Sequence, residues 1–337
     1  MSKNVEISAP LGSDVINAKA YILSAGEYLI LEKNHIAYDK KLTFSCRISS
    51  FKDEDMIRIG HGEKQYCSSY LELTRDKISF FEYFDKITPR AVLEHGLEIK
   101  DFLTVTIDYG IGITKVTAAT ASGVYTSGEL HSCWSGRNGE IFAVSLNSDV
   151  HDVKMRWYSP AYKRRIWILG DSYLNAVSPL RWPSYLVNDG YTNFLMAGFP
   201  GRDCHAALED LKTALTHGTP EYIVWCMGMN NSDNPDSINQ CFLRTAKELA
   251  EICRERGINL ILSTIPCVPE RYNSFKNEWV RNSGYRYVDF AAAVGAETEG
   301  SGWYEGMLSP DRVHPAAPGA KALYARFIAD FPEILTK

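Results

Sequence analysis

The stretch from Ile166 to Ser172 constrains the fold more than any other part of this 337-residue sequence. Four large apolar residues, Ile-Trp-Ile-Leu, follow a basic run and end at Gly170. A short run that is apolar at every position is typical of a strand buried on both faces of a parallel sheet. Gly170 allows the chain to turn sharply at its end. Because ligands bind beyond the carboxyl ends of such strands, Asp171 and Ser172 are predicted to lie at a functional edge.

A second motif near the end of the sequence places Asp311 three residues before His314. In a turn, this spacing lets the carboxylate reach the near ring nitrogen and leaves the other nitrogen free to act as a base. Pro315 disfavours helix at His314, so the motif is predicted to lie on a loop. Taken singly, each motif also fits an ordinary turn, Gly-Asp-Ser with a helix cap and Asp-x-x-His with a local hydrogen bond. Together they supply a nucleophile, a base and an orienting acid.

With these residues in view, the chain resembles the SGNH or GDSL-type serine hydrolases over roughly residues 163 to 337. That family carries four sequence blocks. In this chain they are Gly170-Asp171-Ser172, the glycine Gly201, Gly228-Met229-Asn230-Asn231, and Asp311 with His314. The resemblance implies a flavodoxin-like, three-layer α/β/α domain. It also implies that Ser172 attacks an acyl carbonyl while His314 takes its proton and Asp311 orients the imidazole.

The resemblance further assigns the oxyanion hole to the backbone amides of Ser172 and Gly201 and to the side chain of Asn230. Glycine permits close backbone approach, and an amide side chain donates hydrogen bonds without a charge. Taken alone, Gly201 also fits a helix-entry turn and Asn230 a turn-forming asparagine. The sequence departs from the family at Tyr173, where many members have leucine, and at Asn231, where the pattern has aspartate. Asp171 is interpreted as structural, holding its loop through hydrogen bonds.

Strand and helix signals alternate after residue 160, and strands are predicted at 166–169, 192–196, 222–226, 258–263 and 285–289. Apolar residues recur every three or four positions between them, as in Ala207, Leu208, Leu211 and Leu215, and in Phe242, Ala246, Leu249 and Cys253. Gly257 and Gly284 lie where helix ends favour a left-handed residue. The pattern predicts a five-stranded parallel sheet with helices on both faces.

The first half of the chain shows a different pattern, with short strands such as 42–48, 77–84 and 102–108 and no strong helical period. It predicts an N-terminal antiparallel β-sandwich over residues 1–160, before the hydrolase domain at 161–337. On its strand pattern this half resembles concanavalin-like or laminin-G-like jelly rolls. An accessory role in carbohydrate binding, with Tyr125 or Trp134 stacked on a sugar, is one interpretation. A purely structural sandwich is the alternative.

Composition excludes several classes of partner. The net charge of −5 gives no electrostatic reason to bind nucleic acid or an anionic membrane. No apolar stretch approaches the ~20 residues of a membrane span, and residues 1–6 show no secretory signal. The eight cysteines divide three and five between the halves without a Cys-x-x-Cys, which favours reduced, buried thiols. We therefore expect a cytoplasmic protein, with secretion left open if a leader was trimmed; the oligomeric state is left open too.

The expected substrate is an ester of a small molecule or glycan. Arg181, Trp182, Trp303 and Tyr304 are the candidate substrate contacts, because aromatic side chains suit a sugar face. The first hypothesis is an esterase that removes small acyl groups, most plausibly acetyl, from carbohydrate. The alternatives are a lipid acyl hydrolase or thioesterase, and a sugar-binding module without catalysis. No cofactor is expected, and His131 with Cys133 does not make a metal site.

Overall fold

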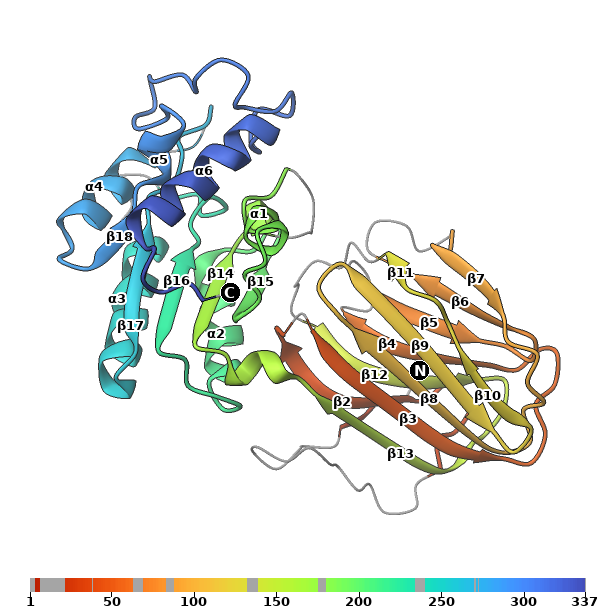
Figure 1. Ribbon diagram of the computed structural model, residues 1–337. Helices are drawn as coiled ribbons and strands as arrows, with labels where there is room; N and C mark the ends of the chain where they lie inside the picture. The colour runs from red at the N-terminus through yellow and green to blue at the C-terminus, as the bar shows by residue number, and fades with distance from the viewer. Residues whose placement is uncertain are drawn as a thin grey trace. The chain divides into compact units, whose positions relative to one another are not determined.

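The computed structural model describes residues 4–6, 22–37, 39–62, 69–82, 88–131, 139–174, 180–233, 240–269, 271 and 273–336. The chain divides into two compact units (Figure 1). Residues 139–160 belong to the first unit, and the second unit runs from Ala161 onward. The first unit consists of strands, whereas the second alternates strands and helices. Each unit is described by itself below.

The first unit is a sandwich of two sheets, as predicted. In the described residues one sheet has the order β1-β2-β12-β4-β5-β6-β7, and the other has the order β10-β9-β8-β3-β13 with β11 paired to β9 (Figure 1). Every pair is antiparallel except β1 with β2. The strands are β1 Asn4–Glu6, β2 Tyr28–His35, β3 Lys40–Ile48, β4 Met56–Gly62, β5 Ser69–Leu73, β6 Lys77–Phe81, β7 Ala91–Glu94, β8 Asp101–Tyr109, β9 Ile113–Thr120, β10 Gly123–Thr126, β11 Leu130–His131, β12 Gly139–Leu146 and β13 His151–Tyr158.

A period of two builds the core of this sandwich. Along β3, Leu42, Phe44 and Cys46 are buried, whereas the residues between them are partly exposed. The same alternation in β8 and in the first four residues of β4 brings apolar side chains of both sheets into one cluster. The predicted strands 42–48 and 102–108 are confirmed within two residues, and the strand predicted at 77–84 ends at Phe81. Residues 83 and 84, and the proposed sugar platform Trp134, lie outside the described residues.

The second unit is built on a five-stranded parallel sheet, which confirms the predicted α/β class. Its order is β15-β14-β16-β17-β18, so the first strand in sequence lies between the second and the third. That order is the flavodoxin-like one, and its ligand edge is the switch point beside the first strand. Every predicted strand is present within two residues. The strands are β14 Ile166–Gly170, β15 Phe194–Gly198, β16 Tyr222–Cys226, β17 Asn259–Ser263 and β18 Arg286–Val288.

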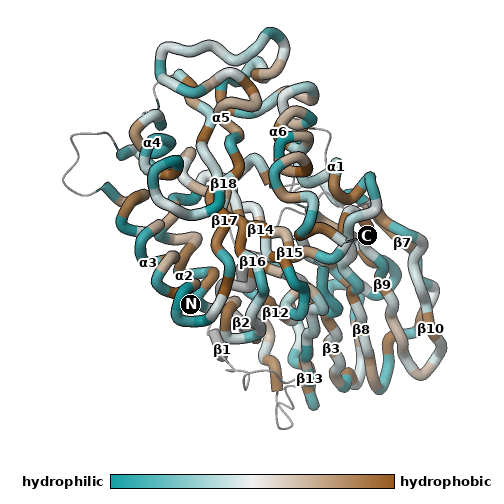
Figure 2. Tube along the Cα trace, turned by 60° about the vertical axis from the view of Figure 1, so that its left-hand side comes forward, coloured by the Kyte–Doolittle hydropathy of each residue, from teal (hydrophilic) through white to brown (hydrophobic). Residues whose placement is uncertain are grey.

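Helices cover both faces of this sheet. The helices α2 and α3 pack together on one face with α4 beside α3, and α1 and α5 pack against α6 on the other (Figure 2). Gly257 (φ +68°) and Gly284 (φ +79°) have the predicted left-handed conformation. No helix in the described ranges combines the length and apolar character that crossing a bilayer requires. The helices are α1 Pro183–Asn188, α2 Cys204–Ala214, α3 Cys241–Arg256, α4 Ser274–Asn282, α5 Phe290–Ala293 and α6 Ala317–Asp330, with 3-10 helices at Pro160–Lys163 and Ser172–Leu174.

Candidate active site

The turn after β14 places Ser172 at the switch point. Gly170 closes the strand where a Cβ atom would lie 2.4 Å from Cδ1 of Leu174 and 3.0 Å from the carbonyl oxygen of Cys226. Only glycine fits this contact without movement of its neighbours. The chain then turns into the short 3-10 helix that begins at Ser172. The serine therefore stands just past the carboxyl end of the central part of the sheet.

The structure brings Ser172, His314 and Asp311 together. Oγ of Ser172 lies 2.7 Å from Nε2 of His314, and Nδ1 of the same ring lies 2.8 Å from Oδ2 of Asp311. His314 lies on a loop closed by the bridge between Leu308 and Pro315, before α6 begins. Because a carboxylate accepts the Nδ1 proton, Nε2 carries the lone pair and can accept a proton from the serine. This is the arrangement of a nucleophile, a base and an orienting acid.

Asp311 is held by donors from its own loop. Its Oδ1 accepts hydrogen bonds from Oγ of Ser309 at 2.5 Å and from the amides of Val313 and His314, each at 2.9 Å. Partial burial by itself would raise the pKa of this carboxyl, but these hydrogen bonds outweigh it and hold the pKa below its usual range. The carboxylate is therefore charged at neutral pH and can stabilise an imidazolium.

Two neighbours of Ser172 connect the loops around it. Asp171 is buried, and Oδ1 accepts the amide of Tyr173 at 3.1 Å, while the amide of Met229 also donates to the carboxylate. Burial raises the pKa of Asp171 to about 6 against these hydrogen bonds. The hydroxyl of Tyr173 donates to the carbonyl of Val313 at 2.6 Å. Asp171 thus joins the serine turn to the loop of Asn230, and Tyr173 joins it to the loop of His314.

The predicted oxyanion donors lie on two adjoining turns. Gly201 has φ +73° in a turn closed by the amide of Arg202 on the carbonyl of Phe199, at 3.1 Å. A Cβ atom on Gly201 would meet nothing within 4 Å, so the backbone angle alone requires glycine there. Nδ2 of Asn230 donates to the carbonyl of Arg202 at 3.2 Å. Asn230 is thereby fixed to the Gly201 turn, and the oxyanion role of these groups stays a prediction.

Asn231, the departure from the family pattern, has a structural contact. Its side chain is buried, and Oδ1 accepts the amide of Cys204, the first residue of α2, at 3.1 Å. It therefore satisfies one of the free amides at the start of that helix. The four blocks are joined in this way to α2 as well as to each other.

The predicted substrate contacts are placed differently from one another. Trp182 is fully buried, with its ring centroid 5.3 Å from that of Phe290 and 5.0 Å from that of Phe327, and it lines the small interior cavity behind the serine turn rather than an exposed surface. Trp303 is half-buried and donates from Nε1 to the carbonyl of Cys267 at 2.9 Å. Tyr304, in contrast, is 58% exposed.

Two further observations concern residues singled out in the sequence. Arg181 is half-buried and donates to the carbonyl of Leu180 at 3.0 Å, and Tyr125 packs partly buried against the sandwich core. In the described ranges, six cysteines are free and no group of three His, Cys, Asp or Glu residues could hold a metal ion. Cys133 lies outside those ranges, and His131 is described only by the backbone pairing of β11 with β9.

Sequence reasoning missed the residues that hold the loop of Asn230. Lys276 and Arg271 both donate to backbone carbonyls of this loop. Lys276 lies on an amphipathic helix and Arg271 in a loop, where lysine and arginine are ordinary surface residues. No spacing or motif in the sequence distinguishes them from exposed cations.

No family model matches the chain, and no curated protein sequence matches it significantly. Solved structures do match. A GDSL-like lipase from Bacteroides thetaiotaomicron is 16% identical, with 50% of this chain and 87% of that chain covered and a TM-score of 0.38. An acetylxylan esterase from Geobacillus stearothermophilus is 15% identical, with 50% and 94% covered and a TM-score of 0.40. A protein named TesA is 19% identical, with 50% and 99% covered and a TM-score of 0.39.

Proposed function

We propose that this protein is a serine esterase that hydrolyses carboxylic esters through an acyl-enzyme intermediate. One observation carries the proposal, the unbroken chain of hydrogen bonds from Oγ of Ser172 through the His314 ring to Asp311, at 2.7 and 2.8 Å. A serine hydroxyl is a weak nucleophile until a base takes its proton. With its Nδ1 proton donated to Asp311, His314 can act as that base through Nε2.

The reaction proceeds in two steps. Oγ of Ser172 attacks the ester carbonyl while Nε2 of His314 takes its proton, and the imidazolium then protonates the leaving alcohol. Water, activated by the same nitrogen, releases the acid from the acyl-serine. The Asp311 carboxylate stabilises the imidazolium in both steps. The amides of Ser172 and Gly201 and Nδ2 of Asn230 stabilise the oxyanion, and within the described part of the chain neither amide donates to another residue.

We propose further that the acyl group is small. The cavity behind the serine turn holds about 20 Å³, room for a water molecule or two. Tyr173, Leu174 and Met229 are among the side chains that line it. Ser172 and His314 are not among its lining residues, so the cavity sets no limit on the acyl chain, and the choice of an acetyl ester over a lipid or thioester substrate is tested by chain length below.

Carbohydrate is the proposed acyl carrier. Tyr304 supports this choice because it is an exposed residue on the segment that leads to Ser309 and Asp311, and an exposed aromatic side chain suits a sugar ring. The sandwich unit would then be an accessory domain, with a sugar-binding or a structural role.

Hydrolysis of p-nitrophenyl acetate, butyrate and octanoate tests the proposal. We expect turnover that falls with chain length and that drops about a millionfold in Ser172→Ala. Octanoate preference would favour the lipid alternative. Unchanged turnover by purified, folded Ser172→Ala would reject the serine mechanism, and binding of acetylated glycans without any turnover would identify a sugar-binding module.

A further inference from the structure

The loop that carries Asn230 is held by cations from a distant segment. We call residues Gly228 to Asn231 the oxyanion loop. Nζ of Lys276, in α4, donates to the carbonyl of Gly228 at 3.1 Å and to the carbonyl of Asn231 at 3.0 Å. A guanidinium nitrogen of Arg271 donates to the carbonyl of Met229 at 2.9 Å. The carbonyls of Gly228 and Met229 before Asn230 and of Asn231 after it are therefore held by side chains more than 40 residues away in sequence.

Lys276 is fully buried and has a complete set of hydrogen bonds. Its third donor binds Oδ1 of Asn273 at 3.0 Å, so three N–H groups meet three oxygens, and all three oxygens are neutral. The rings of Phe242 and Phe275 lie 6.0 and 5.8 Å from Nζ. Burial of an ammonium without a directly bonded carboxylate costs free energy. A charge kept at such a cost next to a candidate active site points to a functional role.

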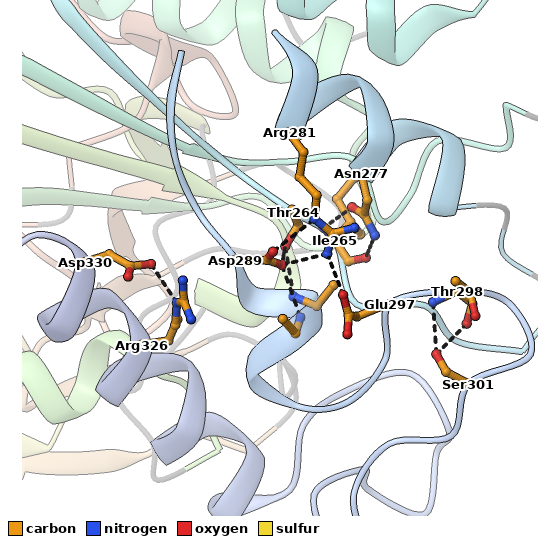
Figure 3. Close-up of polar contacts among 12 residues, drawn as sticks. Thr264, Ile265, Asn277, Arg281, Asp289, Glu297, Thr298, Ser301, Arg326 and Asp330 are labelled. Atoms are coloured by element: carbon orange, nitrogen blue, oxygen red, sulfur yellow. Dashed lines mark hydrogen bonds and ion pairs between the residues drawn. The ribbon is translucent and has the colours of Figure 1, made fainter. Parts of the chain in front are cut away.

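The platform that carries Lys276 is itself fixed. Asn277, the next residue of α4, accepts the amide of Ile265 at 2.6 Å and donates to its carbonyl at 2.9 Å (Figure 3). Arg281, one turn further, binds the carboxylate of Asp289 with both contacts at 3.0 Å (Figure 3). The helix is thus tied to the chain that follows β17 and β18, at the same end of the sheet as Ser172. Movement of Lys276 relative to the oxyanion loop is opposed on both sides.

We infer that Lys276 is a positioning residue for Asn230, because its ammonium fixes the carbonyls of Gly228 and Asn231 at the two ends of the oxyanion loop and so holds the amide side chain between them where the oxyanion develops. The loop has one preferred geometry. Gly228 has φ +129°, where a Cβ atom would lie 2.4 Å from Ile265, and its carbonyl also accepts the amide of Asn231 at 3.2 Å. This inference rests on the proposed esterase function.

The role of Lys276 depends on its charge. The ammonium has three donors for three acceptors, whereas the neutral amine has two and turns a lone pair toward an oxygen. Burial lowers the pKa of Lys276 to about 8, which nearby Asp233 raises and Arg271 lowers. The thiols of Cys204 and Cys267 also interact with it electrostatically, and burial raises the pKa of each thiol to about 12. The clamp is therefore complete below pH 8 and is lost as the pH rises above it, so kcat falls on the alkaline side.

The test compares Lys276→Met with Lys247→Met, the same substitution at an exposed position of α3. With p-nitrophenyl acetate and correction for spontaneous hydrolysis, we expect kcat of Lys276→Met to fall about a hundredfold while KM changes little. The ratio of wild-type to variant kcat should be largest below pH 8 and narrow above it. Leu249→Ala, a core variant, controls for general loss of stability and should leave kcat and its pH profile unchanged.

A double variant separates positioning from general destabilisation. If Lys276 acts through Asn230, Lys276→Met adds little to the loss already caused by Asn230→Ala, whereas independent effects would multiply. Wild-type kcat and pH profile in Lys276→Met, with Ser172→Ala inactive, would overturn the inference and leave the esterase proposal intact. If Lys276→Met does not fold, the wild-type profile decides, because constant kcat from pH 7 to 10 overturns the inference.

Discussion

Two loops serve Ser172 in the proposed reaction, the His314 loop as acid and base and the oxyanion loop as hydrogen-bond donor. They are stabilised in contrasting ways. The His314 loop is stabilised from within, since Ser309, Val313 and His314, which donate to Asp311, lie within three residues of it, and Asp311 itself is half exposed. The oxyanion loop is stabilised from outside, by Arg271 and the buried Lys276. The His314 loop, which we call the local arm, is held by its own residues. The oxyanion loop, which we call the long-range arm, is held by contacts from other parts of the α/β unit.

This contrast predicts which substitutions should affect the catalytic geometry of each loop. A local arm loses function when its own residues change and is insensitive to packing elsewhere. A long-range arm transmits changes from α4 to Asn230, because its geometry exists only in the assembled fold. Variants of single residues can test each side of this difference.

The largest effect is expected from the local arm, in Asp311→Asn. Three donors hold the oxygen of the new amide at the Oδ1 position, so its NH2 group takes the place of Oδ2 and donates to Nδ1 of His314. The ring then adopts the wrong tautomer, and kcat should fall about ten-thousandfold. The melting temperature should change little because the loop is exposed. Steady-state hydrolysis of p-nitrophenyl acetate measures the loss, and Asp330→Asn on α6 is the matched control. A loss below tenfold would show that Asp311 does not orient the histidine.

The next effect is expected from the long-range arm, in Asn230→Ala. Removal of one oxyanion donor should lower kcat about a hundred- to a thousandfold and leave KM nearly unchanged. The matched control is Asn282→Ala at the exposed end of α4. If KM rises while kcat stays constant, Asn230 binds the substrate in the ground state and does not stabilise the oxyanion. The oxyanion loop would then have no catalytic role to compare with that of the His314 loop.

The same contrast explains what the sequence could predict. Asp311 and His314 are three residues apart, and Ser172 follows a strand whose apolar run is unmistakable, so local pattern places all three. The parallel sheet follows from the alternation of strands and helices, and its five strands lie within two residues of their predicted bounds. The sandwich follows from period-two alternation, as in β3.

The residues that pattern could not place are those whose role arises from tertiary contacts. Lys276 reads as a solvent-facing lysine of an amphipathic helix, yet it is fully buried on the carbonyls of another loop. Trp182 reads as a sugar platform after the first block but packs against Phe290 and Phe327 from the far end of the chain. Neither partner is visible from local sequence, because the contacts span more than 40 residues.

A smaller effect concerns Asp171, which joins the serine turn to the oxyanion loop. Burial raises its pKa in the folded state to about 6, above the value of about 4 in the unfolded chain. The folded state is therefore not destabilised while the carboxyl is protonated, and it loses stability as the pH rises from about 4 to 6. Between pH 4.5 and 7.5, wild type should lose about 2 kcal/mol of unfolding free energy relative to Asp171→Asn. Urea unfolding of both proteins at the two pH values measures this, and a pH-independent difference would contradict a buried, ionised Asp171.

The smallest effect is expected at the link between the serine turn and the His314 loop, in Tyr173→Phe. The substitution removes the donor to the carbonyl of Val313 and keeps the buried ring. A loss of about 1 kcal/mol in holding the loop corresponds to a roughly fivefold lower kcat. Tyr185→Phe is the matched control, because that hydroxyl donates to the carbonyl of Ala317 at 3.3 Å, at the start of α6. If both variants keep wild-type kcat, the His314 loop needs no outside support, and the contrast between a self-held arm and a long-range arm becomes sharper. If Tyr173→Phe alone loses activity, the geometry of the His314 loop depends in part on its hydrogen bond with the serine turn.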